Sequence, residues 1–215
     1  MAAQRKRTMT LAEHDAQLKA EGRYDAMIST FRQMEEARLA WDAELARAEA
    51  PLVEDLKRVG WNVQSVWDLV NTSKPYPEAV PILLDHLQRP YPKRIREGIG
   101  RALAVPEAKV GWHVLLDMFK RDDNQTGQGA KSGLASALAA SADDEVLDDL
   151  IDIVRDPRHR SYTLFFVKAF ARSSNPRARE MLAKLSADPE VGTEVQKEFR
   201  RVSRGRTHRG MPRGH

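Results

Sequence analysis

Apolar residues recur along this chain at helical spacing in many short segments. One set is Val80, Leu83, Leu84 and Leu87, whose three- and four-residue intervals place them on one face of a helix. Similar sets follow within residues 114–119 and 146–154. The pattern predicts an all-α protein.

A leucine-rich anchor returns at a nearly constant interval. The anchors begin at Leu83, Leu115, Leu150 and Met181, and each lies within a predicted helix. Self-similarity at a period of 20–50 residues is typical of stacked repeats. We therefore expect about four helix pairs over residues 76–202, with the anchors in the first helix of each pair.

The second helices align with one another independently of the anchors. Segments 95–103, 130–138 and 162–170 place the small residues Ala102, Ala137 and Ala169 at matching positions. Small side chains there would let neighbouring helices approach closely. Turn-forming residues such as Asp156-Pro157 separate the predicted helices.

These features resemble the HEAT-like repeat family. The resemblance rests on the Leu-Leu-Asp anchors, the Asp-Pro turns, and Ile95-Arg96 followed by Ala102-Leu103. Lys131 is basic where the family has arginine, Thr163 departs from the pattern, and the period is nearer the short variety of the repeat. The resemblance implies an α-solenoid over 76–202 whose second helices line the concave face.

Residues 10–75 predict further helices in front of the repeats. Thr10 and Glu13 form a capping-box pattern, and from Tyr24 a long helical pattern carries an apolar stripe in which Pro51 should kink or restart the helix. The stripe suits either an N-terminal helical cap on the first repeat or dimerisation through a coiled coil over 24–59. We favour the cap, because terminal repeats need a covering element and the stripe is short.

Charge is distributed unevenly between the ends and the body of the chain. Residues 1–9 form a basic start and residues 203–215 form an Arg/Gly-rich tail, and both are predicted to be disordered. The chain has no cysteine and no apolar run long enough for a membrane span. We expect a cytoplasmic protein that does not enter membranes.

No pattern of catalytic or metal-ligating residues stands out. The six histidines lack ligand spacing, and the acidic residues within 143–152 suit a helix start and its solvated face. The expectation is a protein without enzymatic activity, cofactor or metal.

The predicted second helices carry a net positive charge and the first helices a net negative one. A groove of one sign attracts a partner of the opposite sign. The expected function is a scaffold that binds an acidic protein surface along a basic concave face. The alternative is nucleic-acid binding through the same face, or more remotely an activity like that of the HEAT-like alkylpurine DNA glycosylases, whose site residues do not map onto this chain. The predicted contact residues are Arg94, Arg101, Lys131, Lys168, Arg172, Arg200 and Arg201, with Arg204, Arg206, Arg209 and Arg213 in the tail.

Overall fold

A computed structural model describes the backbone of residues 9–209 and the side chains of residues 9–201. Every regular element within these residues is an α-helix or a 3-10 helix, which confirms the predicted all-α class. None of the helices in this part of the chain is long and apolar enough to cross a membrane. Most of the predicted basic start, residues 1–8, and the tail residues 210–215 lie outside the described residues.

The chain divides into two compact units, Met1–Arg47 and Ala48–His215, which we call unit 1 and unit 2. Their boundary falls inside a helix and well before residue 76, where the sequence analysis placed the start of the repeats. The difference arises because Leu52 and Leu56, near the end of the long helix, are fully buried. That helix end therefore belongs to the core of unit 2.

Unit 1 contains α1 (Leu11–Ala20) and the first part of α2 (Tyr24–Arg58). The predicted capping box is present, since the Glu13 amide donates to the Thr10 hydroxyl and the Thr10 amide donates to the Glu13 carboxylate. The expected restart at Pro51 is wrong, because α2 continues through this residue as one helix. A proline removes only one backbone donor, and the buried residues that follow it hold the helix in place.

The apolar stripe of α2 has two different environments. Leu52, Val53 and Leu56 are buried, whereas Phe31 and Trp41 are more than half exposed. An N-terminal cap would bury its apolar residues. Within unit 1 taken by itself the stripe of residues 24–47 is largely exposed, and a cap over the first repeat stays a prediction.

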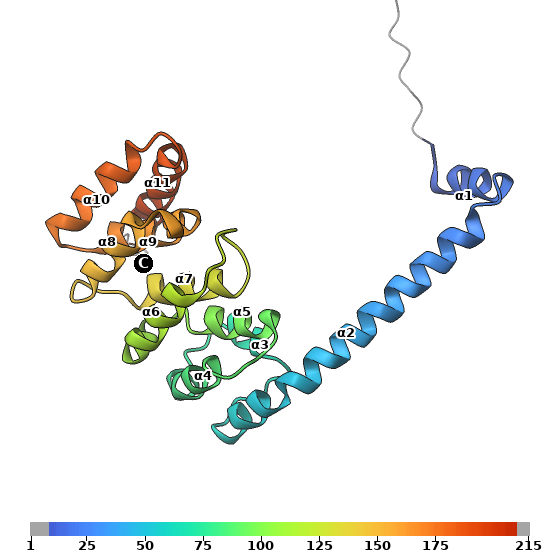
Figure 1. Ribbon diagram of the computed structural model, residues 1–215, viewed down its shortest axis with the longest axis horizontal. Coiled ribbons are helices and arrows are strands. Elements are labelled where there is room, and N and C mark those ends of the chain that lie inside the picture. The colour runs from blue at the N-terminus through green and yellow to red at the C-terminus, as the bar shows by residue number, and fades with distance from the viewer. Residues whose placement is uncertain (1–8, 210–215) are drawn as a thin grey trace, which may run out of the picture. The chain divides into compact units, whose positions relative to one another are not determined.

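Unit 2 continues with α3 and then four successive helix pairs, which Figure 1 shows in colour order from green to red. The helices are α3 (Val66–Val70), α4 (Val80–Leu87), α5 (Lys93–Ala102), α6 (Trp112–Arg121), α7 (Ala130–Ser141), α8 (Leu147–Arg155), α9 (Thr163–Arg172), α10 (Pro176–Ser186) and α11 (Gly192–Arg209). Three of these helices follow short 3-10 turns. The turns are Pro77–Ala79 before α4, Pro106–Gly111 before α6 and Pro157–Tyr162 before α9. Proline suits such turns, because its fixed φ is compatible with the start of a helix.

The second helices of the pairs pack on one another in sequence order. α5 contacts α7, α7 contacts α9, and α9 contacts α11, while each also contacts the first helix of its own pair. The anchor residues Leu83, Leu115 and Leu150 are almost completely buried in this arrangement. The core of unit 2 therefore lies between the two sets of helices.

The last helix extends further than expected. α11 continues to Arg209, so the prediction of disorder from residue 203 is wrong for residues 203–209. Arginine has a high helix propensity, and three of these seven positions are arginines, which favours prolonging an established helix. The tail residues Arg204, Arg206 and Arg209 lie in α11, and Arg213 lies outside the described residues.

Candidate binding groove

Two glycines allow the backbones of α5 and α7 to approach closely. A Cβ atom on Gly100 of α5 would lie 2.7 Å from the backbone of Gly133 in α7, and one on Gly133 would lie 2.6 Å from the carbonyl oxygen of Glu97. Neither position can hold a larger side chain without moving a backbone. The two glycines thus bring α5 and α7 together at the start of the row of second helices.

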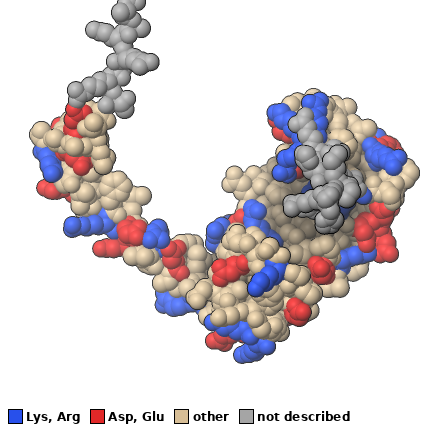
Figure 2. Space-filling view, turned by 180° about the vertical axis from the view of Figure 1, so that it is seen from behind, with Lys and Arg blue, Asp and Glu red and all other residues tan. Residues whose placement is uncertain are grey.

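A groove of about 620 Å³ crosses the exposed side of this row. Its lining combines small residues of α7 with larger residues of α9 and α11. The lining residues are Ala104, Pro106, Ser136, Ala139, Ala140, Leu164, Phe165, Lys168, Arg172, Glu198 and Arg201. Figure 2 shows unit 2 hollowed on one face, with both basic and acidic side chains around the hollow.

Three of the predicted contact residues meet in this groove, but their charges are not equally available. Lys168 is exposed on α9, and no hydrogen bond or ion pair with another described residue is seen for it. Arg201 is bound to Glu198 three residues earlier, at 2.6 Å and 2.8 Å. Lys168 is therefore the exposed cation of this lining for which no partner is seen among the described residues.

Arg172 joins two helices. Its Nη2 donates to the carbonyl oxygens of Ala140 and Ala142, at 3.0 Å and 2.8 Å, and also to that of Ala139. These carbonyls lie at the end of α7, where no helical partner remains for them. Burial lowers the pKa of Arg172. Arg172 therefore caps the carboxyl end of α7. Because its guanidinium is engaged there, it has fewer donors left for a ligand in the groove.

Arg101 lines a second depression that adjoins the groove. The two share Ala104, Pro106 and Ser136, and the second depression continues to the segment between α3 and α4. Arg101 donates from Nε to Glu97, at 3.0 Å, and from Nη2 to Ser132, at 3.4 Å. Together the two depressions form one continuous surface along α5, α7, α9 and α11.

The structure separates the other predicted residues from the groove. The guanidinium carbon of Arg94 lies 3.9 Å from the centre of the Trp67 ring in a cation–π contact. Arg200 is exposed but is not among the residues that line the groove. Neither residue adds charge to the groove lining.

Lys131 is buried, so its prediction as a contact residue is wrong. Only 1% of its surface is exposed, and its ammonium group donates to the carbonyl oxygen of Asp122. The nitrogen lies 5.0 Å from the Phe119 ring centre and 5.3 Å from that of Tyr162. Burial lowers the pKa of Lys131, against the opposing effect of the nearby carboxylates. A count of charges along the sequence cannot show that the Lys131 side chain points into the core.

The sequence analysis missed Leu164 and Phe165 as groove residues. Leu164 is 39% exposed, which is unusual for a large apolar side chain beside a packed helix. The signal was present in the unbroken apolar run of residues 164–167. One buried stripe cannot accommodate four consecutive residues of a helix, so some of them must face outward.

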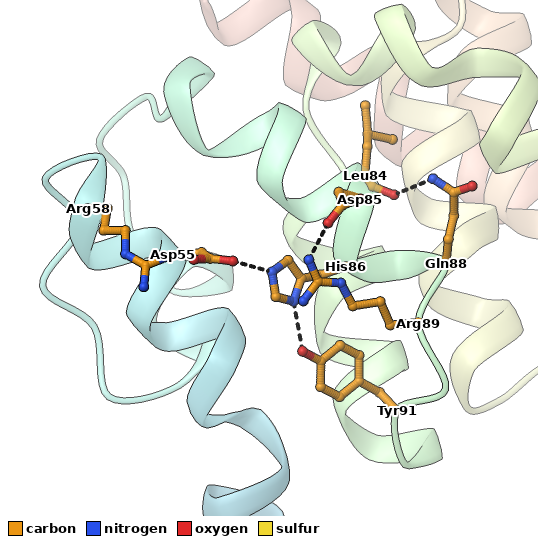
Figure 3. A network of polar contacts seen from close by, with 8 residues as sticks. All are labelled: Asp55, Arg58, Leu84, Asp85, His86, Gln88, Arg89 and Tyr91. Carbon is orange, nitrogen blue, oxygen red and sulfur yellow. Dashed lines mark hydrogen bonds and ion pairs between the residues drawn. The ribbon is translucent and has the colours of Figure 1, made fainter.

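A polar network holds α2 to α4 inside unit 2 (Figure 3). His86 is buried, with Nε2 2.9 Å from a carboxylate oxygen of Asp55 and Nδ1 2.7 Å from the hydroxyl oxygen of Tyr91. The hydrogen bond from His86 lowers the pKa of Asp55. A histidine between an aspartate and a tyrosine can transfer protons, but this ring is only 1% exposed and is enclosed by the helices that it joins. The network therefore serves to hold the two helices together.

The acidic residues before and within α8 make contacts of their own. Lys109 forms ion pairs with Asp143 and Glu145, and Asp144 accepts hydrogen bonds from Ser173 and Ser174. Among the described residues no group of three or more histidine, aspartate and glutamate side chains is placed to hold a metal ion. The acidic cluster connects neighbouring helix pairs.

Comparison with protein-family models, with curated proteins and with solved structures finds no match to this chain.

Proposed function

We propose that unit 2 is a short HEAT-like α-solenoid that acts as a binding scaffold, without enzymatic activity. The support is the repeating helix pair and the ordered row formed by α5, α7, α9 and α11. In such a stack the second helices share one face, and partners bind along it. The groove over α7, α9 and α11 is the proposed binding site.

The proposed partner is an acidic protein segment that also presents apolar side chains. The observation that carries this proposal is the exposed Lys168, for which no partner is seen among the described side chains, beside the partly exposed Leu164 and Phe165. The alanine residues of the lining would receive apolar side chains, and Lys168 would attract a carboxylate. A protein segment can satisfy both kinds of lining.

Nucleic acid is the second candidate, because the lining keeps a net positive charge. Binding to a phosphate backbone depends on several cations that are free to contact successive phosphates. Arg101, Arg172 and Arg201 each donate to groups of their own chain, whereas no such partner is seen for Lys168 among the described residues. This distribution favours the protein segment over nucleic acid.

The test measures binding of three labelled probes to the full chain by fluorescence anisotropy. The probes are a helical peptide of leucine and glutamate, the matched peptide with lysine for glutamate, and a single-stranded DNA of comparable length. We expect the acidic peptide to bind, and Lys168→Glu to weaken its binding by about tenfold or more, because the substitution replaces attraction by repulsion. Tighter binding of DNA, weakening steeply with salt, would support nucleic acid instead.

Lys120→Glu is the matched control, since Lys120 is exposed on α6 and makes the same charge change outside the groove. Equal loss in both variants would assign the effect to overall charge. Leu164→Glu tests the apolar half of the site and should also abolish binding of the acidic peptide. Retained binding in both Lys168→Glu and Leu164→Glu would remove the groove from the proposal.

A further inference from the structure

The first part of α2 exposes large apolar side chains that a soluble helix normally buries. Phe31 is 60% exposed, Met34 63% and Trp41 52%. Single exposed apolar residues are common, but these three lie along one side of the same helix. Such a face is typical of a helix that packs against another molecule.

The spacing of this face is that of a coiled coil. Its six positions alternate between intervals of four and three residues, which is the pattern of the core positions of a heptad repeat. We call these positions the α2 seam, and they are Met27, Phe31, Met34, Arg38, Trp41 and Leu45. A heptad pattern keeps one side of a helix against a partner helix over its whole length, which a contact with a globular surface does not require.

The seam has a defined end. Beyond Leu45 the same stripe turns into the core of unit 2, where Leu52 is fully buried. The length open to a partner is therefore residues 27–45, or about 27 Å of helix.

We propose that the α2 seam binds the α2 seam of a second copy of this chain, in antiparallel orientation. A second copy offers a helix of the same open length with the same heptad spacing. Antiparallel pairing over residues 27–45 places Phe31 against Trp41 of the second copy, Met34 against Arg38 of the second copy, and Met27 against Leu45 of the second copy. All six positions of each seam are then covered, and the two-fold axis lies near residue 36.

Arg38 decides the orientation. In a parallel pair the two copies of Arg38 would face each other in the seam, and like charges at a buried position are unfavourable. In the antiparallel pair each Arg38 faces Met34 of the other copy instead. Its guanidinium already forms ion pairs with Glu35, at 2.6 Å, and Asp42, at 2.8 Å, on its own helix. The charge is therefore compensated at the edge of the seam while the aliphatic part of the side chain covers Met34 of the second copy.

The first test is sedimentation equilibrium of the full chain across protein concentrations. A seam of this length predicts a monomer–dimer equilibrium with a dissociation constant on the order of 10 μM. Phe31→Glu combined with Trp41→Glu should raise that constant at least about 100-fold, because four carboxylates would be buried in the dimer. The far-ultraviolet circular dichroism and melting temperature of unit 2 should not change, since both side chains are exposed in the monomer.

Ala43→Glu is the matched control, because Ala43 is exposed on the side of α2 opposite the seam. It should leave the dissociation constant within about twofold of the unmodified chain. A chain that is monomeric at about 200 μM, or a dimer that persists in the double glutamate variant, would overturn the proposal.

The orientation is tested with a spin label, which the chain permits because it contains no cysteine of its own. Ala46→Cys carries the label on an exposed position just beyond the seam. In the antiparallel dimer residue 46 lies level with residue 26 of the second copy, so the two labels are about 30 Å apart along the axis. Pulsed electron resonance should report that distance, and a distance near 15 Å would overturn the antiparallel assignment.

Discussion

Basic side chains that look alike in the sequence have three different roles in unit 2. Lys131 is buried against aromatic rings, Arg172 closes the end of α7, and Lys168 remains open to solvent. All three were expected to line one basic face. The sequence identifies their helices correctly, but whether a long side chain points inward depends on neighbours from other helices.

His159 is a second buried group at the residue scale. It is 3% exposed, lies against Phe119 with ring centres 4.9 Å apart, and its Nδ1 has no hydrogen-bond partner among the described residues. Burial lowers the pKa of His159, and the positive charge of Lys131 acts in the same direction. The folded protein therefore holds this ring neutral.

We predict that His159 makes unit 2 less stable in mild acid. The unfolded chain, with a histidine pKa of about 6.5, takes up the proton more readily than the folded chain. Stability should therefore be fully present above about pH 6.5 and should be lost as the pH falls through the lower pKa of the folded state. Urea unfolding at several pH values between about 5 and 7.5 measures this slope.

His159→Phe should flatten that pH dependence, because phenylalanine cannot bind a proton and can keep the contact with Phe119. An equal loss of stability with falling pH in the variant and in the unmodified chain would show that other groups cause it.

At the scale of elements, the predicted and observed helices of unit 2 agree closely. The predicted segments 95–103, 130–138 and 162–170 lie within α5, α7 and α9 to within one residue. Helix boundaries could be predicted because apolar periodicity and turn residues are local properties of the sequence. The continuation of α2 through Pro51 could not be predicted from the sequence, because it depends on how the helix packs against the rest of unit 2.

The Gly100–Gly133 contact was also missed. Close approach was expected at Ala102, Ala137 and Ala169, which are indeed buried, but the two glycines also bring the backbones of α5 and α7 close together. The helix alignment pairs Gly133 with Gly98 rather than with Gly100. Only the stagger between neighbouring helices determines which glycines meet.

We predict that Gly133→Ala destabilises unit 2 by about 1–3 kcal/mol. Alanine is the better helix former, but its Cβ would lie 2.6 Å from the carbonyl oxygen of Glu97, so α5 and α7 would have to separate. Ser136→Ala in the same helix is the control and should change the free energy of unfolding by no more than about 0.5 kcal/mol. Chemical denaturation of both variants gives the comparison, and a stabilised Gly133→Ala would contradict the close contact.

At the scale of the molecule, unit 2 begins within α2. Residues 48–58 supply Leu52, Leu56 and Asp55, the last of which binds His86. The sequence suggested one boundary between an N-terminal segment and the repeats, because apolar periodicity does not change at residue 48. Burial changes there, and burial cannot be read from a continuous heptad pattern.

We predict that a fragment of residues 48–215 folds alone. Its melting temperature, followed by circular dichroism, should lie within about 5 °C of the unit 2 transition of the full chain, because it retains the buried end of α2. A fragment of residues 59–215 lacks Leu52, Leu56 and the Asp55–His86 hydrogen bond, and should melt at least about 10 °C lower. Equal melting of the two fragments would mean that the end of α2 is dispensable.

α7 has a consequence for how freely this sequence can change. Ten of its twelve residues are buried, and most are alanine, glycine or serine. Substitutions in such a helix almost always add volume, and neighbours on both sides leave no space for it. Substitutions on α4, α6, α8 and α10, whose outer faces are exposed, mostly replace one solvated side chain by another. Mutational tolerance should therefore be lowest in α7. Variants of this protein that are selected for function should carry most of their substitutions outside that helix.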